Sequence, residues 1–230
     1  MEPYSAQQTA ILLFTRSPLL EWEAKPFGKK GELLSLLNGR ALNTVKNCNL
    51  PFYIIDENEQ RGSTFGERFV NALVSVFEKG HKGIIAIGND TPSLKTAQVR
   101  TAAKIMESGR SVLGPSTDGG FYLLGVHRST FEHQSFVNLP WCTNKLATSL
   151  VWLLESSGST LVKLRRLLDL DTLEDLRAYM KGHDTISSIK YLLVRLFAVP
   201  QMAPIPRLAL IYPYHRDFPH NKGSPENHRF

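Results

Sequence analysis

The chain has 230 residues, of which 42% are hydrophobic, and this suits one domain of ordinary size with a single large core, or such a domain with an extension. The formal net charge of +6 fits the binding of a phosphorylated ligand, whereas the lack of any nucleic-acid recognition motif argues against a nucleic acid as partner. The two cysteines, Cys48 and Cys142, form no CxxC pair, which argues against a disulfide framework or a zinc site and predicts a reducing compartment.

No segment has the length and composition of a membrane span or a secretory signal. Residues 1–9 are polar and contain no apolar signal core. The most apolar later run, residues 191–199, is too short to cross a bilayer and contains Arg195. We therefore expect a soluble cytoplasmic protein.

The first half of the chain alternates short apolar runs with stretches of helical periodicity. The periodicity predicts helices over residues 31–47, 65–77 and 96–107, and the apolar runs predict strands over residues 10–15, 52–55, 84–87, 112–113 and 121–126. The run Ile84–Ile87 lacks polar alternation, so it is expected to be buried on both faces, as in a parallel sheet. The pattern predicts an α/β fold with a mostly parallel central sheet flanked by helices, whose ligands bind at the carboxyl ends of the strands.

The second half begins with a predicted helix that runs through Leu154, with Thr143 as its N-cap. A strand is expected over residues 160–164. Thr172 and Asp175 resemble a capping box, which predicts a helix through Met180.

Composition changes at Gly182, after which proline and histidine become frequent and one further helix is expected over residues 186–198. We expect an α/β domain over residues 1–181 and a C-terminal extension over residues 182–230, made of a helix and then a Pro/His-rich tail. The apolar residues of this extension could form a homodimer interface or pack within the chain; they are Leu192, Leu193, Leu196 and Phe197.

Asp90 is the first candidate functional residue, because it follows the buried strand 84–87 directly and is flanked by Gly88, Asn89 and Thr91. A carboxylate at such a strand end suits a hard divalent cation, Mg²⁺ or Mn²⁺, which binds oxygen ligands and bridges diphosphates. The alternative is that Asp90 caps the next helix through Thr91 and Pro92.

Three further groups of residues are candidates. Asp118, Gly119 and Gly120 could bring a carboxylate and a close backbone to a ligand, or could form a hairpin turn. Asp169 and Asp171 alternate on an extended segment and could face one cleft, or Asp171 or Thr172 could cap the helix that follows. The basic residues of the first loop could bind phosphates or could be surface residues; they are Arg16, Lys25, Lys29 and Lys30.

Other common site motifs are absent. The sequence has no GxxxxGK[ST], no GxGxxG and no GxSxG, so it lacks the fingerprints of a P-loop, a dinucleotide site and a serine hydrolase elbow. The histidines show no HExxH or other tight metal spacing.

Several segments taken together resemble a bacterial family of uncharacterised glycosyltransferase-like proteins. Residues 60–68 resemble its "Q-x-G-x-x-L-G-E-R", residues 87–94 its "I-G-S-D-x-P-x-L", and residues 113–125 its "L-G-P-x-x-D-G-G-Y-Y-L-I-G". Residues 140–143 and 169–176 match "P-W-S-T" and "D-x-D-T-x-E-D-L". These segments occur in the family's order and cover about residues 10–180.

The resemblance implies the Rossmann-like GT-A fold of the nucleotide-diphospho-sugar transferase superfamily, with a nucleotide-sugar or nucleotide ligand and a divalent cation, Mg²⁺ or Mn²⁺. In that superfamily an acid at the position of Asp90 commonly binds the metal, and in some relatives a later acid, here Asp171, completes the metal site. The resemblance further implies phosphate or nucleotide contacts from other positions, namely Arg16, Lys25, Gly88, Asn89, Gly119 and Gly120.

The chain departs from the family's pattern after its first strand. The family usually continues with "F-A-K-x-P-x-x-G-x-x-K-T-R-L", and residues 14–18 fit the beginning of this motif. Residues 21–27 then replace the glycine and the Thr-Arg-Leu, and Lys25 takes the place of the usual lysine after one inserted residue. In superfamily relatives this loop contacts the nucleotide phosphates.

Three functions follow from these observations. The first is a metal-dependent, glycosyltransferase-like enzyme in which Asp90 holds the cation and Asp118 orients the sugar or acts as general base toward an unknown acceptor. The second is a nucleotidyltransferase on the same fold, which usually requires an intact glycine-rich first loop. The third is a non-catalytic nucleotide-binding or assembly module, which the altered loop and the C-terminal extension favour.

Overall fold

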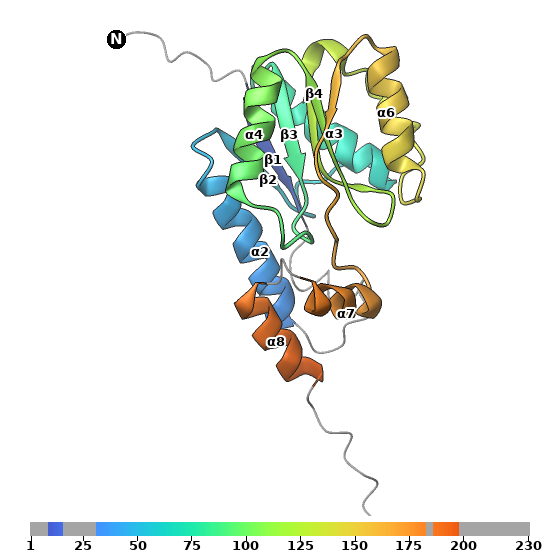
Figure 1. Cartoon of the computed structure of the whole chain (residues 1–230). Coiled ribbons are helices and arrows are strands. Elements are labelled where there is room, and N and C mark those ends of the chain that lie inside the picture. The colour runs from blue at the N-terminus through green and yellow to red at the C-terminus, as the bar shows by residue number, and fades with distance from the viewer. Residues whose placement is uncertain (1–8, 16–30, 183–185, 198–230) are drawn as a thin grey trace, which may run out of the picture. The chain divides into compact units, whose positions relative to one another are not determined.

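The computed structural model describes residues 9–15, 31–182 and 186–197 (Figure 1). Arg16, Lys25 and the Pro/His-rich tail lie outside these ranges, so the predictions that concern them stay predictions. Among the described residues no helix is both long and apolar enough to cross a membrane.

The described residues form one six-stranded sheet with the strand order β2-β1-β3-β5-β4-β6. Strand β5 runs antiparallel to its neighbours β3 and β4, and the other neighbouring pairs are parallel. The predicted mostly parallel α/β sheet is therefore confirmed. The strands are β1 Thr9–Phe14, β2 Phe52–Ile55, β3 Gly83–Ile87, β4 Ser111–Pro115, β5 Phe121–His127 and β6 Leu161–Lys163.

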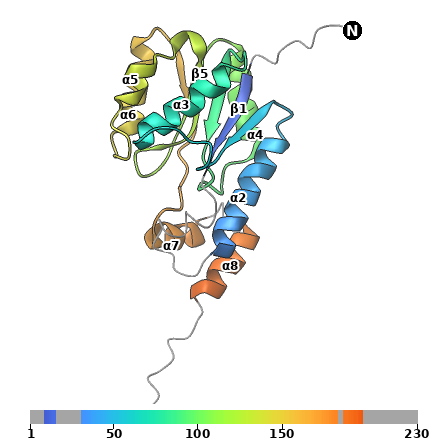
Figure 2. The ribbon, with the colours of Figure 1, turned by 180° about the vertical axis from the view of Figure 1, so that it is seen from behind.

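Helices cover both faces of this sheet. Figure 1 shows α4 on the near face, and Figure 2, seen from behind, shows α3 on the opposite face. The helical elements are α2 Gly31–Lys46, α3 Phe65–Phe77, α4 Thr96–Glu107, the 3₁₀ turn η1 Arg128–Thr130, α5 His133–Val137, α6 Leu146–Ser156, α7 Leu173–Lys181 and α8 Ser187–Phe197.

The two-sided burial of the central strands explains their apolar sequences. Ala10 and Leu12 of β1 pack into the core on one face, together with α3 and α6, whereas Ile11 and Leu13 pack into the core on the other face, together with α4. Side chains of a strand alternate between faces, so a strand that is covered on both sides is apolar at most of its positions. The predicted burial of Ile84–Ile87 is confirmed, since all four residues are at most 2% exposed.

A third apolar cluster joins α2, α7 and α8, which lie side by side in both ribbon views (Figures 1 and 2). Ile189, Leu192 and Leu193 of α8 pack in it with Leu33 and Leu37 of α2. Leu192 and Leu193 therefore pack within the chain, which was one of the two predicted alternatives for these residues; the other was a homodimer interface. The boundary at residue 182 and a homodimer through the extension stay predictions.

Two local predictions for the second half of the chain have opposite outcomes. The capping box of α7 is confirmed, because Thr172 Oγ1 accepts from Asp175 N and Asp175 Oδ2 accepts from Thr172 N. The N-cap at Thr143 is wrong, because α6 begins at Leu146 and Thr143 Oγ1 donates to Pro140 O at 2.7 Å. Residues 140–145 form a separate turn in which Cys142 adopts a φ of 57°.

The packing of α8 predicts a large effect of Leu193→Ala on stability. Leu193 is fully buried, so its truncation should lower the free energy of unfolding by about 2–4 kcal/mol. The matched control is Val194→Ala, at a position that is 51% exposed, and its effect should stay within about 0.5 kcal/mol. Urea denaturation of both variants measures this, and equal small effects would show that α8 contributes nothing to the core.

Candidate functional site

A cavity of about 540 Å³ lies at the carboxyl ends of β1 and β3 and beside the connection between β4 and β5. Four aspartates line it, and the predicted site residues Asp90, Asp118 and Asp171 are among them. Ligands of parallel α/β sheets bind at this edge. Among the described residues the lining comprises Phe14, Thr15, Phe65, Phe69, Ile87, Gly88, Asn89, Asp90, Ser116, Asp118, Gly120, Phe121, Trp141, Cys142, Thr143, Asn144, Leu146, Asp169 and Asp171.

Asp90 reaches the cavity because β3 ends at Ile87 and the chain turns at Gly88. A Cβ atom on Gly88 would lie 3.1 Å from Asp90 Oδ1, so glycine lets the carboxylate fold back against the backbone. Helix α4 begins only at Thr96 and has Lys95 as its N-cap. The alternative interpretation of Asp90 as a helix cap is therefore wrong.

Asp118 is held by the turn between β4 and β5. Its Oδ1 accepts from Gly120 N at 2.9 Å and from Ser116 Oγ, and Ser116 N donates to Gly120 O at 3.0 Å. The predicted hairpin turn is thus present, and the same turn delivers Asp118 to the cavity. The two hydrogen bonds fix the orientation of this carboxylate.

Gly119 and Gly120 have different surroundings. Gly120 lines the cavity, whereas Gly119, with a φ of 94°, is not among the lining residues and packs against the backbone of Asn144. A Cβ atom on Gly119 would lie 2.2 Å from Asn144 O, and Gly119 O accepts from Ala147 N at 2.9 Å. Gly119 therefore joins the turn to the start of α6.

The segment after β6 brings two more carboxylates to the cavity. It runs along β4, where Leu167 N donates to Pro115 O and Thr117 N donates to Leu167 O. Leu170 N then donates to Asp90 O at 2.9 Å, which ties the segment to the end of β3. The prediction that Asp169 and Asp171 face one cleft agrees with their place in the cavity lining, and the cap of α7 is Thr172.

Asp169 is the most buried of these acids, with 9% of its surface exposed. Burial raises its pKa to about 8, and the nearby charges of Asp90 and Asp118 act in the same direction. The hydrogen bond from Thr91 Oγ1 and the nearby hydroxyl of Ser116 oppose this rise. Negative charge is thus concentrated at this edge of the sheet, and the buried carboxyl retains its proton instead of ionising.

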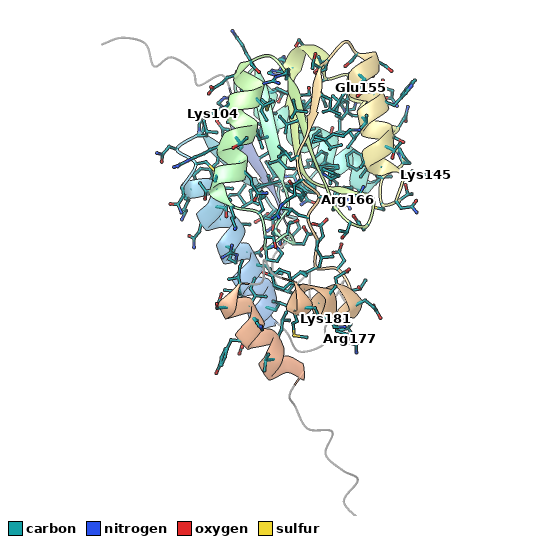
Figure 3. The ribbon with its side chains drawn as sticks, in the orientation of Figure 1. Lys104, Lys145, Glu155, Arg166, Arg177 and Lys181 are labelled. Atoms are coloured by element: carbon teal, nitrogen blue, oxygen red, sulfur yellow. The ribbon has the colours of Figure 1, made fainter. Side chains whose placement is uncertain are left out.

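No lysine, arginine or histidine is among the described residues that line the cavity. Figure 3 labels five exposed cationic residues that are not in this lining, namely Lys104 on α4, Lys145 before α6, Arg166 between β6 and α7, and Arg177 and Lys181 on α7. An anionic ligand would therefore meet carboxylates without any compensating charge from the described lining. Arg16 and Lys25, the predicted phosphate contacts, lie outside the described residues.

The carboxylates suit a hard cation by their chemistry, because Mg²⁺ and Mn²⁺ prefer oxygen ligands and favour the ionised form of the acids that bind them. Within residues 9–15, 31–182 and 186–197 no group of three Asp, Glu, His or Cys side chains is arranged to hold a metal by itself. A cation at Asp90 and Asp171 would therefore need further oxygen ligands from a substrate or from water.

Polar residues between β1, α2 and β3 form a network at the rim of the cavity. Asn38 Oδ1 accepts from Asn89 Nδ2 and from Thr15 Oγ1, the latter at 3.2 Å. Gln60 Nε2 donates to Thr15 O at 2.9 Å. Gly88 and Asn89, the predicted phosphate contacts, thus lie at the end of β3. Helix α2 holds this strand end through the hydrogen bond between Asn38 and Asn89.

An aromatic wall, defined as Phe14, Phe65, Phe69, Phe121 and Trp141, also lines the cavity. Its rings contact one another with centroid separations between 5.1 and 6.3 Å. Sequence reasoning assigned the helical stripe of Phe65 and Phe69 to the core and did not connect it with Trp141. It also had no reason to connect Thr91 or Ser116 with Asp169, or Asn38 with Asn89, because only the fold brings these residues together.

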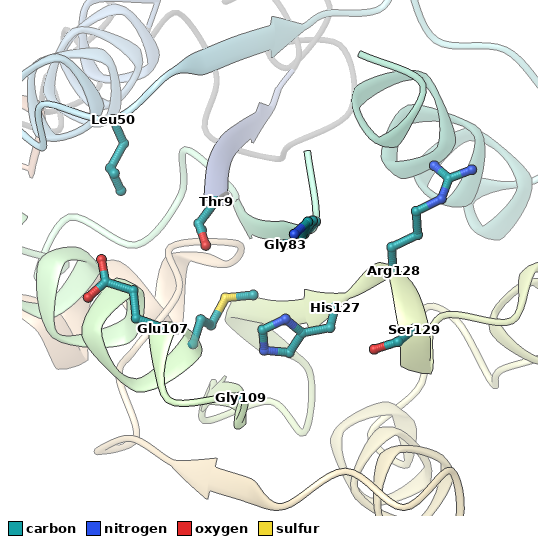
Figure 4. Close-up of a pocket in the computed structure, with 10 residues that line it drawn as sticks. Thr9, Leu50, Gly83, Glu107, Gly109, His127, Arg128 and Ser129 are labelled. Carbon is teal, nitrogen blue, oxygen red and sulfur yellow. The ribbon is translucent and has the colours of Figure 1, made fainter. Parts of the chain in front are cut away.

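A second cavity, of about 860 Å³, lies near the opposite ends of the strands (Figure 4). Thr9 at the start of β1, Gly83 at the start of β3 and His127 at the end of β5 line it. Its lining contains one carboxylate, Glu107, and none of the predicted site residues. The acids therefore distinguish the smaller cavity as the candidate site.

Comparisons with known proteins agree with the predicted resemblance. The model of the family described as "Uncharacterized protein conserved in bacteria (DUF2064)" matches residues 54–143, which contain Asp90, Asp118 and most of the motifs named above. The resemblance to this bacterial family is thereby confirmed for the central part of the chain. No curated protein sequence matches the chain.

Two of the similar solved structures illustrate the fold of this chain. A protein of Desulfovibrio desulfuricans G20, described as a "putative nucleotide-diphospho-sugar transferase", is 21% identical, with a TM-score of 0.71 over 83% of this chain and 96% of that chain. The Mycobacterium tuberculosis H37Rv protein Rv0371c is 16% identical, with a TM-score of 0.50 over 77% of this chain and 100% of that chain. The chain thus has the nucleotide-diphospho-sugar transferase fold, as predicted.

Gly119→Ala should lower the stability of the protein more than the same substitution at Gly158. The alanine would combine an unfavourable φ of 94° with a clash against Asn144 O, so it should displace the turn that carries Asp118. Gly158→Ala is the matched control, because Gly158 has a φ of 79° but open space around it. We expect Gly158→Ala to cost about 1–2 kcal/mol of stability and Gly119→Ala clearly more, measured by urea denaturation.

The raised pKa of Asp169 predicts a pH dependence of stability in the presence of EDTA. Between its usual pKa of 3.8 and its folded pKa of about 8, the folded protein keeps a proton that the unfolded chain has released. The stability contributed by this group therefore falls as pH rises through that window, by roughly 1 kcal/mol per pH unit at most.

Asp169→Asn removes this titration, so the variant should gain stability relative to the wild type as pH rises from 6 to 8. Glu174→Gln, on the exposed surface of α7, should follow the wild-type profile. Parallel profiles of wild type and Asp169→Asn would contradict the raised pKa.

Proposed function

We propose that this protein binds a nucleotide-diphospho-sugar together with Mg²⁺ or Mn²⁺ and transfers the sugar to an acceptor. The observation that carries this proposal is the cavity at the carboxyl edge of the sheet, which Asp90, Asp118, Asp169 and Asp171 line together. The fold supports the same ligand class, although a fold alone does not determine a reaction.

The charge of the cavity supports the dependence on a cation. A diphosphate is an anion, and the ionised carboxylates that line the same cavity would repel it. A cation that is bound by Asp90 and Asp171 would bring the diphosphate into this cavity and neutralise the charge that develops on the leaving nucleoside diphosphate.

The residues of the chain then have distinct tasks. The polypeptide around Gly88 and Asn89 would approach the phosphates, because both residues line the cavity beside Asp90. Asp169 accepts a hydrogen bond from Thr91 Oγ1 and would help to keep the acids that face the ligand in position. Arg16 and Lys25 of the first loop are proposed to add positive charge on the phosphate side.

Asp118 is the proposed general base. An acceptor hydroxyl oxygen would form a bond to the anomeric carbon while the bond from that carbon to the diphosphate oxygen breaks. The hydroxyl proton would pass to Asp118, and the nucleoside diphosphate would leave. The hydrogen bonds from Ser116 Oγ and Gly120 N hold this carboxylate in a fixed orientation for that task.

Thermal unfolding with a panel of UDP-, GDP-, CDP- and dTDP-sugars tests the proposal. At least one of these ligands should stabilise the protein in Mn²⁺ but not in EDTA, by about 2.7 kcal/mol when its concentration is a hundred times Kd. Asp90→Asn should abolish this stabilisation. Asp56→Asn, at the carboxyl end of the neighbouring strand β2 and outside the cavity lining, should retain it.

The other outcomes identify the alternative functions. Stabilisation by nucleoside triphosphates but by none of the sugars would indicate a nucleotidyltransferase. Stabilisation without any turnover of the bound nucleotide-sugar would indicate a binding module. If no nucleotide shifts the unfolding temperature, both enzymatic functions are contradicted, and if Asp90→Asn keeps the metal dependence, the role of Asp90 is wrong.

A further inference from the structure

The aromatic wall has a character different from that of the carboxylates in the same cavity. Its members come from the end of β1, from the first turns of α3, from the start of β5 and from the 140–145 turn. Phe69 is central, since its ring contacts Phe14 at 5.3 Å, Phe121 at 5.7 Å and Trp141 at 5.1 Å. Four segments far apart in the sequence therefore build one continuous apolar surface.

The aromatic wall packs against the core, but part of its surface is open to the cavity. Phe69 is buried, but Phe14, Phe65, Phe121 and Trp141 are only partly buried and line the cavity. Exposed aromatic area is unfavourable in water, at roughly 25 cal/mol per Å² of apolar surface left uncovered. Phe14, Phe65 and Phe121 carry no polar atom that would reduce this cost, and a bound apolar group would remove it.

The wall is held in place before any ligand binds. Trp141 Nε1 donates to Phe136 O at 2.9 Å, and the indole lies on Gly66, where a Cβ atom would come within 2.4 Å of Trp141 Cδ1. The helix that carries Phe65 and Phe69 starts with a capping box between Thr64 and Glu67. Fixed rings lose little conformational entropy when a ligand covers them.

The wall offers no hydrogen-bonding group to a ligand. Four of its members are phenylalanines, and the indole N–H of Trp141 is already donated to Phe136 O. A nucleobase is normally selected by hydrogen bonds to its edge as well as by stacking, so this wall suits a group that is recognised by its flat apolar face alone. The cavity volume of about 540 Å³ fits a small molecule rather than a protein segment.

The position of the carboxylates indicates which functional group the ligand has besides its flat apolar face. Phe121 follows Gly120 directly in the turn that holds Asp118, so wall and proposed general base belong to the same end of the β4–β5 hairpin. A ligand that lies on the wall and reacts in this cavity would present a hydroxyl group toward Asp118.

We propose that the aromatic wall is the acceptor subsite and that the acceptor carries its reactive hydroxyl on an aryl ring or on a similarly flat apolar group. This inference rests on the proposed sugar transfer and adds the chemical class of the acceptor. It divides the cavity into a polar, cation-dependent half for the nucleotide-sugar and an apolar, cation-independent half for the acceptor.

The test measures two kinds of binding to the full chain. Binding of 2-naphthol is followed by NMR in EDTA, with cyclohexanol as the non-aromatic comparison, and nucleotide-sugar binding is followed by the Mn²⁺-dependent thermal shift. We expect 2-naphthol to bind without a cation and more tightly than cyclohexanol. Phe65→Leu should weaken 2-naphthol about 5- to 10-fold and leave the nucleotide-sugar shift unchanged.

Phe131→Leu is the matched control. Phe131 contacts Phe77 at 5.2 Å and Phe136 at 4.9 Å in the core and does not line the cavity, so this variant should bind 2-naphthol as the wild type does.

Each remaining outcome counts against a specific part of the inference. A nucleotide-sugar shift without any 2-naphthol binding would overturn the acceptor subsite and leave the proposed function intact. Loss of the nucleotide-sugar shift in Phe65→Leu would assign the wall to the nucleobase and overturn the proposal. Binding of 2-naphthol without any nucleotide-sugar shift would instead remove the proposed transfer and, with it, the acceptor role of the wall.

Discussion

The short contact network around Asp169 brings three distant parts of the chain to one edge of the sheet. Thr91 Oγ1, after β3, donates to this carboxyl group, and Ser116, after β4, also lies against it. Leu170 N, directly after Asp169, donates to Asp90 O. These bonds compensate for burying a carboxyl group that the low dielectric of the interior would otherwise disfavour. The network thus ties the segment of Asp169 to the end of β3, which carries Asp90.

The cavity that results has two halves with opposite chemistry. The acids concentrate negative charge, which favours a divalent cation and opposes a bare anion. The aromatic wall carries no charge and no free donor. Both halves are built on strand ends and helix starts that the packed core holds in place, such as the first turns of α3, and their relative positions are therefore determined by the fold rather than by a ligand.

The interpretation of single residues changes once the fold is known. Asp90 looked equally suited to a metal and to a helix cap, and the start of α4 at Thr96 removes the second role. The two interpretations of Asp118 are compatible, because one hairpin turn both forms the connection and presents the carboxylate. For Thr143 the local preference for a cap was overridden, since the 140–145 turn delays the start of α6. In each case the short-range pattern allowed more than one interpretation, and the fold showed which of them hold.

The sequence by itself determined the fold class, the strand positions and the capping box of α7, because these depend on periodicity and on groups within a few residues of one another. Its ordered motifs also identified the family resemblance and the acids Asp90, Asp118 and Asp171. Only the tertiary structure decided which acid is buried, that Gly119 packs on Asn144, and that rings from β1, α3, β5 and the 140–145 turn share one wall. Burial and through-space contact depend on residues that can be more than a hundred positions apart along the chain. Phe14 and Trp141, for example, line the same cavity, and the local pattern around either residue does not reveal the other.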